Sequence, residues 1–384
     1  MTDPLVSFVV PCYKLAHLLP ECVHSMLAQT YGRFEVLIMD DCSPDETPEV
    51  ARSFGDPRIR HIRNESNLGH LHNYNKGISL ARGKYVWLIS ADDRLRKPYV
   101  LERYVRIMER HPRAGYVFCP AVRLDEGQET NVVGHASPGG RDAVISGHRF
   151  LIRLVNVNFV VAPCVMVRKE CYEKVSLFPL DMPWGGDWYL WCVFALHYDV
   201  AYCAEPMVNY RRHALSMTDT LTNQDLRECA EEDVALPWRI KQKAEEAGCL
   251  AMVKRCRISI AHQYASGIAS RKYRSSKSWH EYSLTLGQFE GSLLRNTSHR
   301  HEQNFIRARV YAGLADTYFW KREFARSLEF YEKALQQDPW MVQVWAKYLL
   351  LRAGKAGIRF RERLPALRRT LSSMRLPGRP GYQG

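Results

Sequence analysis

The first 115 residues alternate between two hydrophobic patterns, and this alternation limits the possible folds more than any other feature of the chain. Short apolar runs typical of buried strands are separated by segments in which apolar residues recur at helical spacing. The strand-like runs are residues 6–10, 35–39, 59–62, 84–89 and 115–119, and the helix-like segments are residues 17–30, 48–54, 73–81 and 98–110. Such alternation predicts a mostly parallel, Rossmann-like sheet with helices on both faces.

The C-terminal part of the chain differs in composition and in its hydrophobic pattern. From about residue 223, Gly and Pro become rarer, and apolar residues recur at helical spacing to about residue 351. We therefore expect an α/β domain over residues 1–225, an all-α helical-repeat-like domain over 226–352 and a basic tail over 353–384.

One segment of the helical region follows the spacing of a tetratricopeptide helix-turn-helix repeat. Its residues are Tyr311, Leu314, Tyr318, Phe324, Leu328, Tyr331, Ala334, Leu335 and Pro339, with Ser327 at the usual small position. Weaker echoes occur at Tyr264, Tyr273, Trp279 and Leu284, and again from Trp345. Because such repeats need neighbours to bury their faces, we expect an array of helical hairpins.

Composition excludes several classes of protein. The apolar content of 46% and the charged content of 25% are those of an ordinary soluble globular protein. No apolar run approaches the ~18–20 residues needed to span a bilayer, and the N-terminal residues lack the basic leader of a signal peptide. The eleven cysteines form no Cys-x-x-Cys pair. We therefore expect a cytoplasmic protein with reduced thiols and no zinc site.

The net charge of +13 is concentrated at the C-terminus. Residues 352–384 contain eight Arg and one Lys against a single acid, Glu362. This end could contact an anionic membrane surface at the inner face, could bind a polyanionic substrate, or could be a solvated basic tail. No nucleic-acid recognition motif accompanies the charge, so no nucleic-acid partner is expected.

Two carboxylates, Asp92 and Asp93, closely follow the apolar run of residues 85–89. Ligands of open α/β sheets bind in the crevice beyond the carboxyl ends of the strands, where this pair is expected to lie. Because the two like charges repel, a hard divalent cation held by nucleotide phosphates is their usual partner. The alternative is that the pair only caps the next helix.

Two further strand ends carry polar residues. Asp40 and Asp41 follow the second strand, where an acid can accept a hydrogen bond from a base or a ribose hydroxyl, or can simply form a turn. After the first strand, Pro11-Cys-Tyr13-Lys lacks the glycine pattern of dinucleotide-binding and P-loop enzymes. Tyr13 could stack on a base while backbone groups near Pro11 read its edge; a plain loop tyrosine is the alternative.

The motifs combine into a longer pattern. Asn67-Leu-Gly69, Asn75-Lys-Gly77 and Ala81-Arg-Gly83-Lys-Tyr85 lead into Ser90-Ala-Asp92-Asp93. With these motifs, residues 6–93 closely resemble the nucleotide-binding half of the family 2 glycosyltransferases, which adopt the GT-A fold. The resemblance continues in Pro163-Cys-Val-Met-Val-Arg168, Trp184-Gly-Gly-Asp187-Trp and Tyr210-Arg-Arg-His213-Ala-Leu-Ser216, and covers roughly the first 220 residues.

The resemblance implies a hexosyltransferase-class enzyme that is inverting and metal-dependent. It implies a nucleoside-diphosphate-sugar donor and a hydroxyl acceptor on a glycan, a lipid-linked oligosaccharide or a protein, in bacterial surface-polysaccharide synthesis or protein glycosylation. The implied donor-binding residues are Pro11, Tyr13, Asp41, Asn67, Gly69, Asn75, Asp92 and Arg212. The implied ligands of Mg²⁺ or Mn²⁺ are Asp93 and His213, and the implied general base is Asp187. The alternatives are a helix N-cap for Asp187 and a structural histidine for His213.

The chemistry is coherent for these residue types. An acceptor hydroxyl needs a carboxylate within hydrogen-bond reach, and a leaving diphosphate needs its charge neutralised. One base and one leaving group describe a single in-line displacement, which inverts the anomeric carbon. Three positions depart from the family pattern: Tyr74 replaces an Arg, Ser90 an Asp and Gly186 a Glu.

Two rival functions remain at this stage. A degenerate GT-A platform could serve as a scaffold whose helical region binds a protein partner or a second copy of the chain. The retention of both Asp93 and Asp187 argues against decay. A nucleotidyltransferase on a related sheet would need a Gly- and Lys-rich first loop, which is absent here.

Overall fold

The computed structural model describes residues 3–125, 127–134, 140–213, 216–269, 273–274 and 281–373. The chain forms two compact units. The first comprises Met1–Ser259 with Arg274–Tyr282, and the second comprises Ile260–Tyr273 with Ser283–Gly384. Among the helices of the described residues, none combines the length and the apolar character that a membrane crossing requires.

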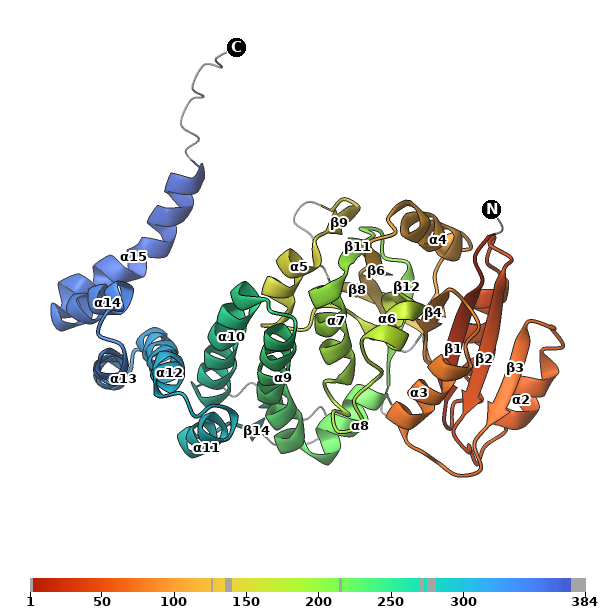
Figure 1. The fold of residues 1–384 in the computed structure, drawn as a ribbon, viewed down its shortest axis with the longest axis horizontal. Helices are drawn as coiled ribbons and strands as arrows, with labels where there is room; N and C mark the ends of the chain where they lie inside the picture. Colours follow the sequence, from red (N-terminus) through yellow and green to blue (C-terminus); the bar gives the residue numbers. More distant parts are fainter. Residues whose placement is uncertain are drawn as a thin grey trace, which may run out of the picture. The chain divides into compact units, whose positions relative to one another are not determined.

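The first unit is built on a large mixed sheet (Figure 1). Its strand order is β3-β2-β1-β4-β10-β6-β11-β9. The strands are β1 (Val6–Cys12), β2 (Phe34–Asp40), β3 (Ile59–Arg63), β4 (Tyr85–Leu88), β6 (Ala114–Phe118), β9 (Ala143–Ile145), β10 (Val165–Arg168) and β11 (Asp199–Tyr202). Strands β1 to β4 pair in parallel, and the chain reverses its direction of travel across the sheet between β1 and β4. That reversal creates the crevice in which open α/β sheets bind ligands.

Both faces of the sheet are covered by helices, as the alternation predicts. Along β1, Phe8 and Val10 join one core with α1 (Leu19–Leu27) and α4 (Val100–Arg110). The intervening Val9 joins the opposite core with α3 (His70–Leu80) and α7 (Gly186–His197). Successive side chains of a strand point to opposite faces, so a strand buried on both sides reads as the continuous apolar run seen in the sequence. The predicted GT-A-type α/β fold is confirmed.

A smaller sheet brings a distant segment to the end of β4. Its order is β5-β12-β7-β8, and β12 pairs with both β5 and β7. Its strands are β5 (Arg94–Leu95), β7 (Ala121–Asp125), β8 (Gln128–Val133) and β12 (Val208–Arg212). The remaining short helices before residue 225 are α2 (Thr47–Ser53), α5 (Gly147–Leu154), η1 (Ala162–Cys164), α6 (Lys169–Lys174) and α8 (Met217–Gln224). Because β5 directly follows Asp93, the sheet places the residues around 211 beside the acidic pair.

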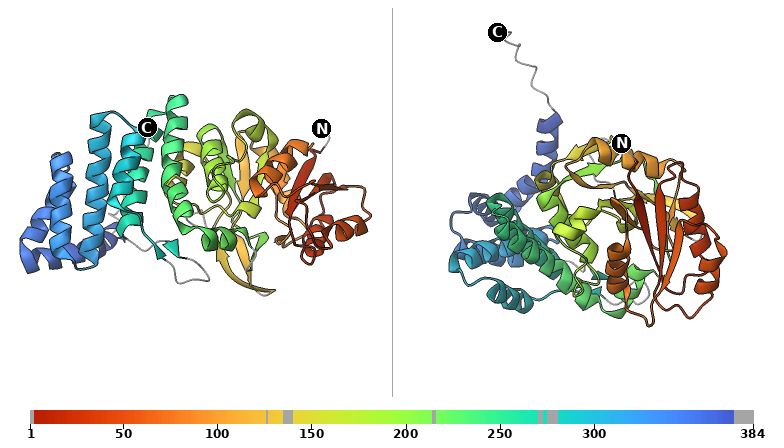
Figure 2. Two further views of the ribbon diagram at one scale, coloured as in Figure 1. Left: turned by 90° about the horizontal axis from the view of Figure 1, so that it is seen from below. Right: turned by 45° about the vertical axis from the view of Figure 1, so that its right-hand side comes forward.

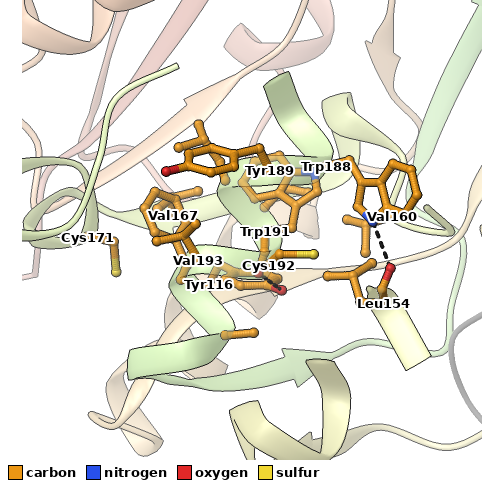
Figure 3. Close-up of a cluster of buried hydrophobic side chains, with 14 of the residues drawn as sticks. Tyr116, Leu154, Val160, Val167, Cys171, Trp188, Tyr189, Trp191, Cys192 and Val193 are labelled. Atoms are coloured by element: carbon orange, nitrogen blue, oxygen red, sulfur yellow. Dashed lines mark hydrogen bonds between the residues drawn. The ribbon is translucent and has the colours of Figure 1, made fainter. Parts of the chain in front are cut away.

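Helix α7 anchors the core on one side of the sheet. Figure 3 shows its side chains among those of neighbouring elements, with Trp188 donating its indole N–H to the carbonyl of Leu154 at 2.7 Å. The hydroxyl of Tyr116, from β6, donates to the carbonyl of Trp191 at 3.1 Å. Nearly all of α7 is buried, so its N-terminus is held in a fixed place at the edge of the crevice.

One helix that follows residue 225, and the first half of the next, also belong to the first unit. Leu236 and Ile240 of α9 (Leu226–Glu246) lie in the same core as α7, together with Met252 from the first part of α10 (Leu250–Ala269). The change in composition near residue 225 therefore marks the end of the large and small sheets, whereas the first compact unit continues to Ser259. The apolar pattern of a helix does not show which neighbour the helix packs against. The sequence-based boundary at 225 therefore assigned α9 to the helical domain.

The second unit is all-helical over its described residues from 283 onward. Its helices are α11 (Leu286–Asn296), α12 (Arg300–Trp320), α13 (Phe324–Gln337), α14 (Val342–Arg352) and α15 (Gly354–Ser373). Figure 2 shows α12, α13 and α14 side by side, in agreement with the contacts between successive helices. Ser327 lies buried between α12 and α13 and donates to the carbonyl of Ala315 at 2.7 Å. The predicted helical C-terminal region is confirmed, but it is interrupted by a small two-stranded sheet of β13 (Tyr273–Arg274) and β14 (Glu281–Tyr282), which the sequence did not predict. Trp279 and tail residues 374–384 lie outside the described residues.

Candidate active site

The carboxyl ends of β1, β2 and β4 meet at one edge of the sheet, and their loops are hydrogen-bonded to each other. The backbone N–H of Asp41 donates to the carbonyl of Cys12 at 2.9 Å, and that of Ala91 donates to the carbonyl of Pro11 at 3.1 Å. The residues predicted after three separate strands are therefore neighbours. This follows from parallel pairing, which places equivalent strand ends together.

The acidic pair is buried and is held from the β12 side. The exposed fractions of Asp92 and Asp93 are 9% and 4%. The backbone N–H of Arg211 donates to Asp93 Oδ1 at 2.9 Å, and the Arg211 Nε donates to the carbonyl of Asp92 at 2.8 Å. His213 Nε2 lies 2.9 Å from Asp92 Oδ2. The pair does not cap α4, whose N-cap is Tyr99.

The electrostatics of the acidic pair leave it in need of a positive partner. Burial and the neighbouring charge of Asp92 raise the pKa of Asp93 well above its usual range, although Arg211 acts in the opposite direction. Asp92 Oδ1 is a buried oxygen with no hydrogen-bond partner. Such an atom costs free energy unless something binds it.

The metal-ligating side chains present here suit a cation that binds together with a nucleotide. Among the described residues, no group of three or more His, Cys, Asp or Glu side chains is assembled to hold a metal by itself. Mg²⁺ is commonly held by one or two carboxylates together with substrate phosphates, so a complete protein cage is not required. Asp93, Asp92 with its unpartnered oxygen, and His213 are the residues that would contribute.

Asp187 lies in the first turn of α7, partly exposed at the edge of the crevice. Its Oδ1 accepts from the backbone N–H of Trp188 at 2.5 Å, and Asn158 Nδ2 lies 3.4 Å from its Oδ2. Burial raises the pKa of Asp187 to about 6, against the effect of these hydrogen bonds. The N-cap residue of α7 is Gly185, and Asp187 lies two positions further on, where its carboxylate accepts a backbone N–H of the first turn.

Tyr74 lies near both Asp187 and the acidic pair. Burial, followed by the negative charges of Asp92, Asp187 and Asp93, raises the pKa of Tyr74 well above its usual range, so its phenol is within electrostatic reach of all three acids. Its ring packs edge-on against those of His70 and Phe178.

The carboxylate of Asp41 shapes the loop that begins α3. It accepts from Asn64 Nδ2 and from the backbone N–H of Leu68, both at 2.8 Å, and from the N–H of Gly69 at 3.0 Å. Asn67 Oδ1 accepts from the same N–H of Gly69 at 3.0 Å. Gly69 has a positive φ of 79°, a conformation that glycine adopts without a steric penalty. The predicted residues of this loop therefore form one hydrogen-bonded unit.

Asn75 and Arg212 are engaged away from the acidic pair. The amide of Asn75 donates to the carbonyl of Phe178 at 2.9 Å and accepts from its N–H at 3.0 Å, so it joins α3 to that segment. Arg212 forms an ion pair with Asp219 at 2.6 Å. Tyr13, by contrast, is 41% exposed at the end of β1, with the Lys14 ammonium 5.0 Å from its ring centre.

Arg211 is the site residue that the sequence reasoning missed. Its guanidinium forms an ion pair with Glu21 of α1, and Arg94 pairs with the same carboxylate. The alternation of side-chain direction along β12 is the sequence feature that could have indicated Arg211. Side chains two apart share a face, so Arg211 and His213, the residue just after β12, lie on one face and both contact Asp92, whereas Arg212 pairs with Asp219.

Comparisons with known proteins identify the family to which the chain is similar. Residues 7–176 match the family described as Glycosyl transferase family 2. An uncharacterized glycosyltransferase of Rickettsia prowazekii is 30% identical over 272 residues, which are 70% of this chain and 79% of that protein. The putative teichuronic acid biosynthesis glycosyltransferase TuaG of Bacillus subtilis is 34% identical over 109 residues, covering 28% of this chain and 43% of TuaG.

Solved structures resemble the chain in fold. S. aureus TarS 1–349 in complex with UDP-GlcNAc superposes with a TM-score of 0.53 at 14% identity, covering 90% of each chain. The complex of the same protein with UDP superposes with a TM-score of 0.56 over 86% of this chain and 90% of that one.

Proposed function

The chain belongs to family 2 of the glycosyltransferases, and from this premise we propose that it transfers one sugar from a nucleoside-diphosphate donor to an acceptor hydroxyl with inversion. The observation that carries the proposal is the buried pair Asp92 and Asp93 at the strand-order reversal, with one unpartnered carboxylate oxygen. Buried like charges with an unsatisfied acceptor are costly for folding alone, which argues for a ligand that compensates them.

The donor would bind along the edge formed by β1, β2 and β4. Tyr13 offers an exposed ring for the base, and the loop of Asp41, Asn67 and Gly69 offers backbone and carboxylate groups to the nucleoside. Asp92 would face the ribose or the sugar. Asn75 and Arg212 would support these contacts indirectly, since their polar groups engage Phe178 and Asp219.

Asp93 and His213, with Asp92 beside them, would hold a divalent cation, Mg²⁺ or Mn²⁺. When bound, the cation would neutralise the charge that develops on the departing diphosphate. The protein itself contributes the burial of the acids, which excludes water, and the Arg211 contacts, which hold the backbone of Asp92 and the carboxylate of Asp93 in place.

Asp187 would accept the proton of the acceptor hydroxyl. The acceptor oxygen forms a bond to the anomeric carbon while the bond from that carbon to the phosphate oxygen breaks, and the proton passes to the Asp187 carboxylate. A pKa of about 6 leaves the carboxylate ionised at neutral pH and yet more basic than an ordinary aspartate, which suits a general base. Attack from the face opposite the leaving group inverts the anomeric carbon.

We propose a surface polysaccharide or its lipid-linked precursor as the acceptor class. The support comes from relatives, namely TuaG, named for teichuronic acid biosynthesis, and the succinoglycan biosynthesis protein ExoO of Rhizobium meliloti, which is 38% identical over 112 residues covering 29% of this chain and 31% of ExoO. A UDP-linked sugar is the first donor class to test, because the similarly folded TarS structure contains UDP-GlcNAc.

The proposal is tested by thermal stability against UDP-, GDP-, dTDP- and CMP-linked sugars, with and without Mn²⁺. A donor at ~1,000 times its Kd should stabilise the folded state by about 4 kcal/mol, and only when the cation is present. Asp93→Ala should abolish the shift. Folded protein that shows no shift with any donor would favour a scaffold whose helical unit binds a partner.

We further propose that the protein acts in the cytoplasm and docks on an anionic membrane through its C-terminal unit. Trp340 is 89% exposed, and Val342 and Leu349 are exposed along α14. Residues 353–384, which follow α14, carry seven Arg and one Lys against one acid, which favours anionic lipid and disfavours a second copy of the same charge.

Flotation with vesicles tests the docking. The protein should float with phosphatidylglycerol-containing vesicles and much less with pure phosphatidylcholine, and high salt should weaken the binding. Trp340→Ser should reduce binding several-fold. Leu294→Ser, which removes another exposed apolar side chain of the same unit, is the matched control and should have no effect. Equal binding to neutral vesicles, or none to either, would contradict the proposal.

A further inference from the structure

Two buried acids of α9 face the loop that leads into Asp187. Glu232 and Asp233 are each only 7% exposed, although both are carboxylates on a helix that has ample solvent-facing positions. Neither belongs to a motif by which the sequence was related to a family. Burial of a carboxylate is expensive unless it receives hydrogen bonds from several donors.

The donors are the groups at the start of α7. Glu232 Oε2 accepts from the backbone N–H of Gly185 at 2.7 Å and from that of Trp184 at 3.0 Å. Asp233 Oδ1 accepts from the indole N–H of Trp184 at 3.0 Å. The two acids therefore hold the backbone and the side chain of the residues that precede Asp187.

Glu232 lies at the N-terminus of α7, because it accepts the N–H of the N-cap residue Gly185. The first N–H groups of a helix have no partner within the helix, and the helix N-terminus carries a partial positive charge. Burial nevertheless raises the pKa of Glu232 to about 7, so the position is not an ideal one for stability. Positions kept at a cost in stability are common where function needs a fixed geometry.

The chain lacks an acid of its own beside the base, because Gly186 precedes Asp187. We propose that Glu232 is a positioning residue for the reaction, which reaches from α9 to fix the turn that presents Asp187 to the acceptor. The inference rests on the proposed role of Asp187. It does not require contact between Glu232 and any substrate, since Glu232 acts through Trp184 and Gly185.

The same loop has independent supports, so removing Glu232 should not unfold it. His70 Nε2 lies 3.1 Å from the carbonyl of Pro183, and Arg239 donates to Asp181 at 3.0 Å. Loss of Glu232 should therefore loosen the turn at 184–186 while the rest of the segment stays in place.

The test compares Glu232→Ala with Glu231→Ala, which changes the neighbouring exposed acid that pairs with Arg227. We expect Glu232→Ala to lower kcat by about 10²-fold, the scale of a displacement of ~1 Å in a catalytic group. The Kd of the nucleotide donor should change less than twofold, because the donor edge is formed by other strands. Glu232→Gln should recover part of the loss, since its amide oxygen can accept from one of the two N–H groups.

Amide hydrogen exchange gives a readout that needs no turnover. In Glu232→Ala, the N–H groups of Trp184 and Gly185 should lose protection, whereas the amides of β1 should keep theirs. Unchanged exchange, or a kcat equal to that of Glu231→Ala, would overturn the inference. If the wild type transfers no sugar while the exchange result holds, the proposed function fails and the control of the turn by Glu232 stands.

Discussion

Asp93→Asn is expected to lower kcat for sugar transfer by about 10³-fold, which corresponds to about 4 kcal/mol of lost transition-state stabilisation. The change removes a cation ligand and leaves the side-chain volume almost unchanged. The free energy of unfolding of the apoprotein should not fall, because the repulsion between two buried carboxylates disappears. Steady-state kinetics with the donor identified by thermal shift, and a urea unfolding curve, measure the two effects.

Asp56→Asn provides the matched control for this change. Asp56 forms an ion pair with Arg58 at 2.7 Å before the start of β3, so it lies at the end of the strands away from the crevice. Its replacement should leave kcat within about twofold, as expected for a surface site. An Asp93→Asn enzyme that keeps more than a tenth of the activity would remove Asp93 from the cation site.

The second large effect concerns Asp187. Because a general base must be ionised, kcat/KM of the wild type should rise about tenfold per pH unit below pH 6 and level off above it, following the pKa of about 6. Asp187→Asn should lower kcat by about 10³-fold and remove this rise. A pH–rate profile of both proteins measures the effect.

Asn158→Ala gives a second test of whether Asp187 is the general base. Its amide hydrogen bond favours the ionised form of Asp187, so losing it should raise the pKa and move the rising limb to higher pH. A limb that persists unchanged in Asp187→Asn would belong to another group, such as the substrate, and would contradict the role of Asp187 as the base.

Local patterns were enough to predict the fold and the acidic pair. The run of residues 85–89 is continuously apolar, and together with the helical segments around it such a run predicts a strand inside a sheet covered by helices. Two acids after that strand then have to lie at its carboxyl end. Both inferences need information from one short stretch, together with the general rule for where open sheets bind ligands.

Contacts between residues far apart in the sequence could not be predicted. Arg211 contacts residues more than a hundred positions away, so its pairing depends on how the second sheet docks beside β4. Asn75 looked like a donor contact, yet its amide is engaged by the backbone of Phe178. A sequence motif gives the residue type, whereas the direction of the side chain depends on the folded neighbours. The binding roles of the individual residues stay predictions.

The two halves of the crevice have separate origins in the chain. The acids proposed for the donor follow β4 within the first hundred residues, while Asp187 comes from α7 and Glu232, which holds the turn before it, comes from α9. The region that matches the family ends at residue 176, before any of the latter. Recognition of the incoming hydroxyl can therefore differ between relatives whose likeness is confined to residues 7–176, so such relatives need not share an acceptor.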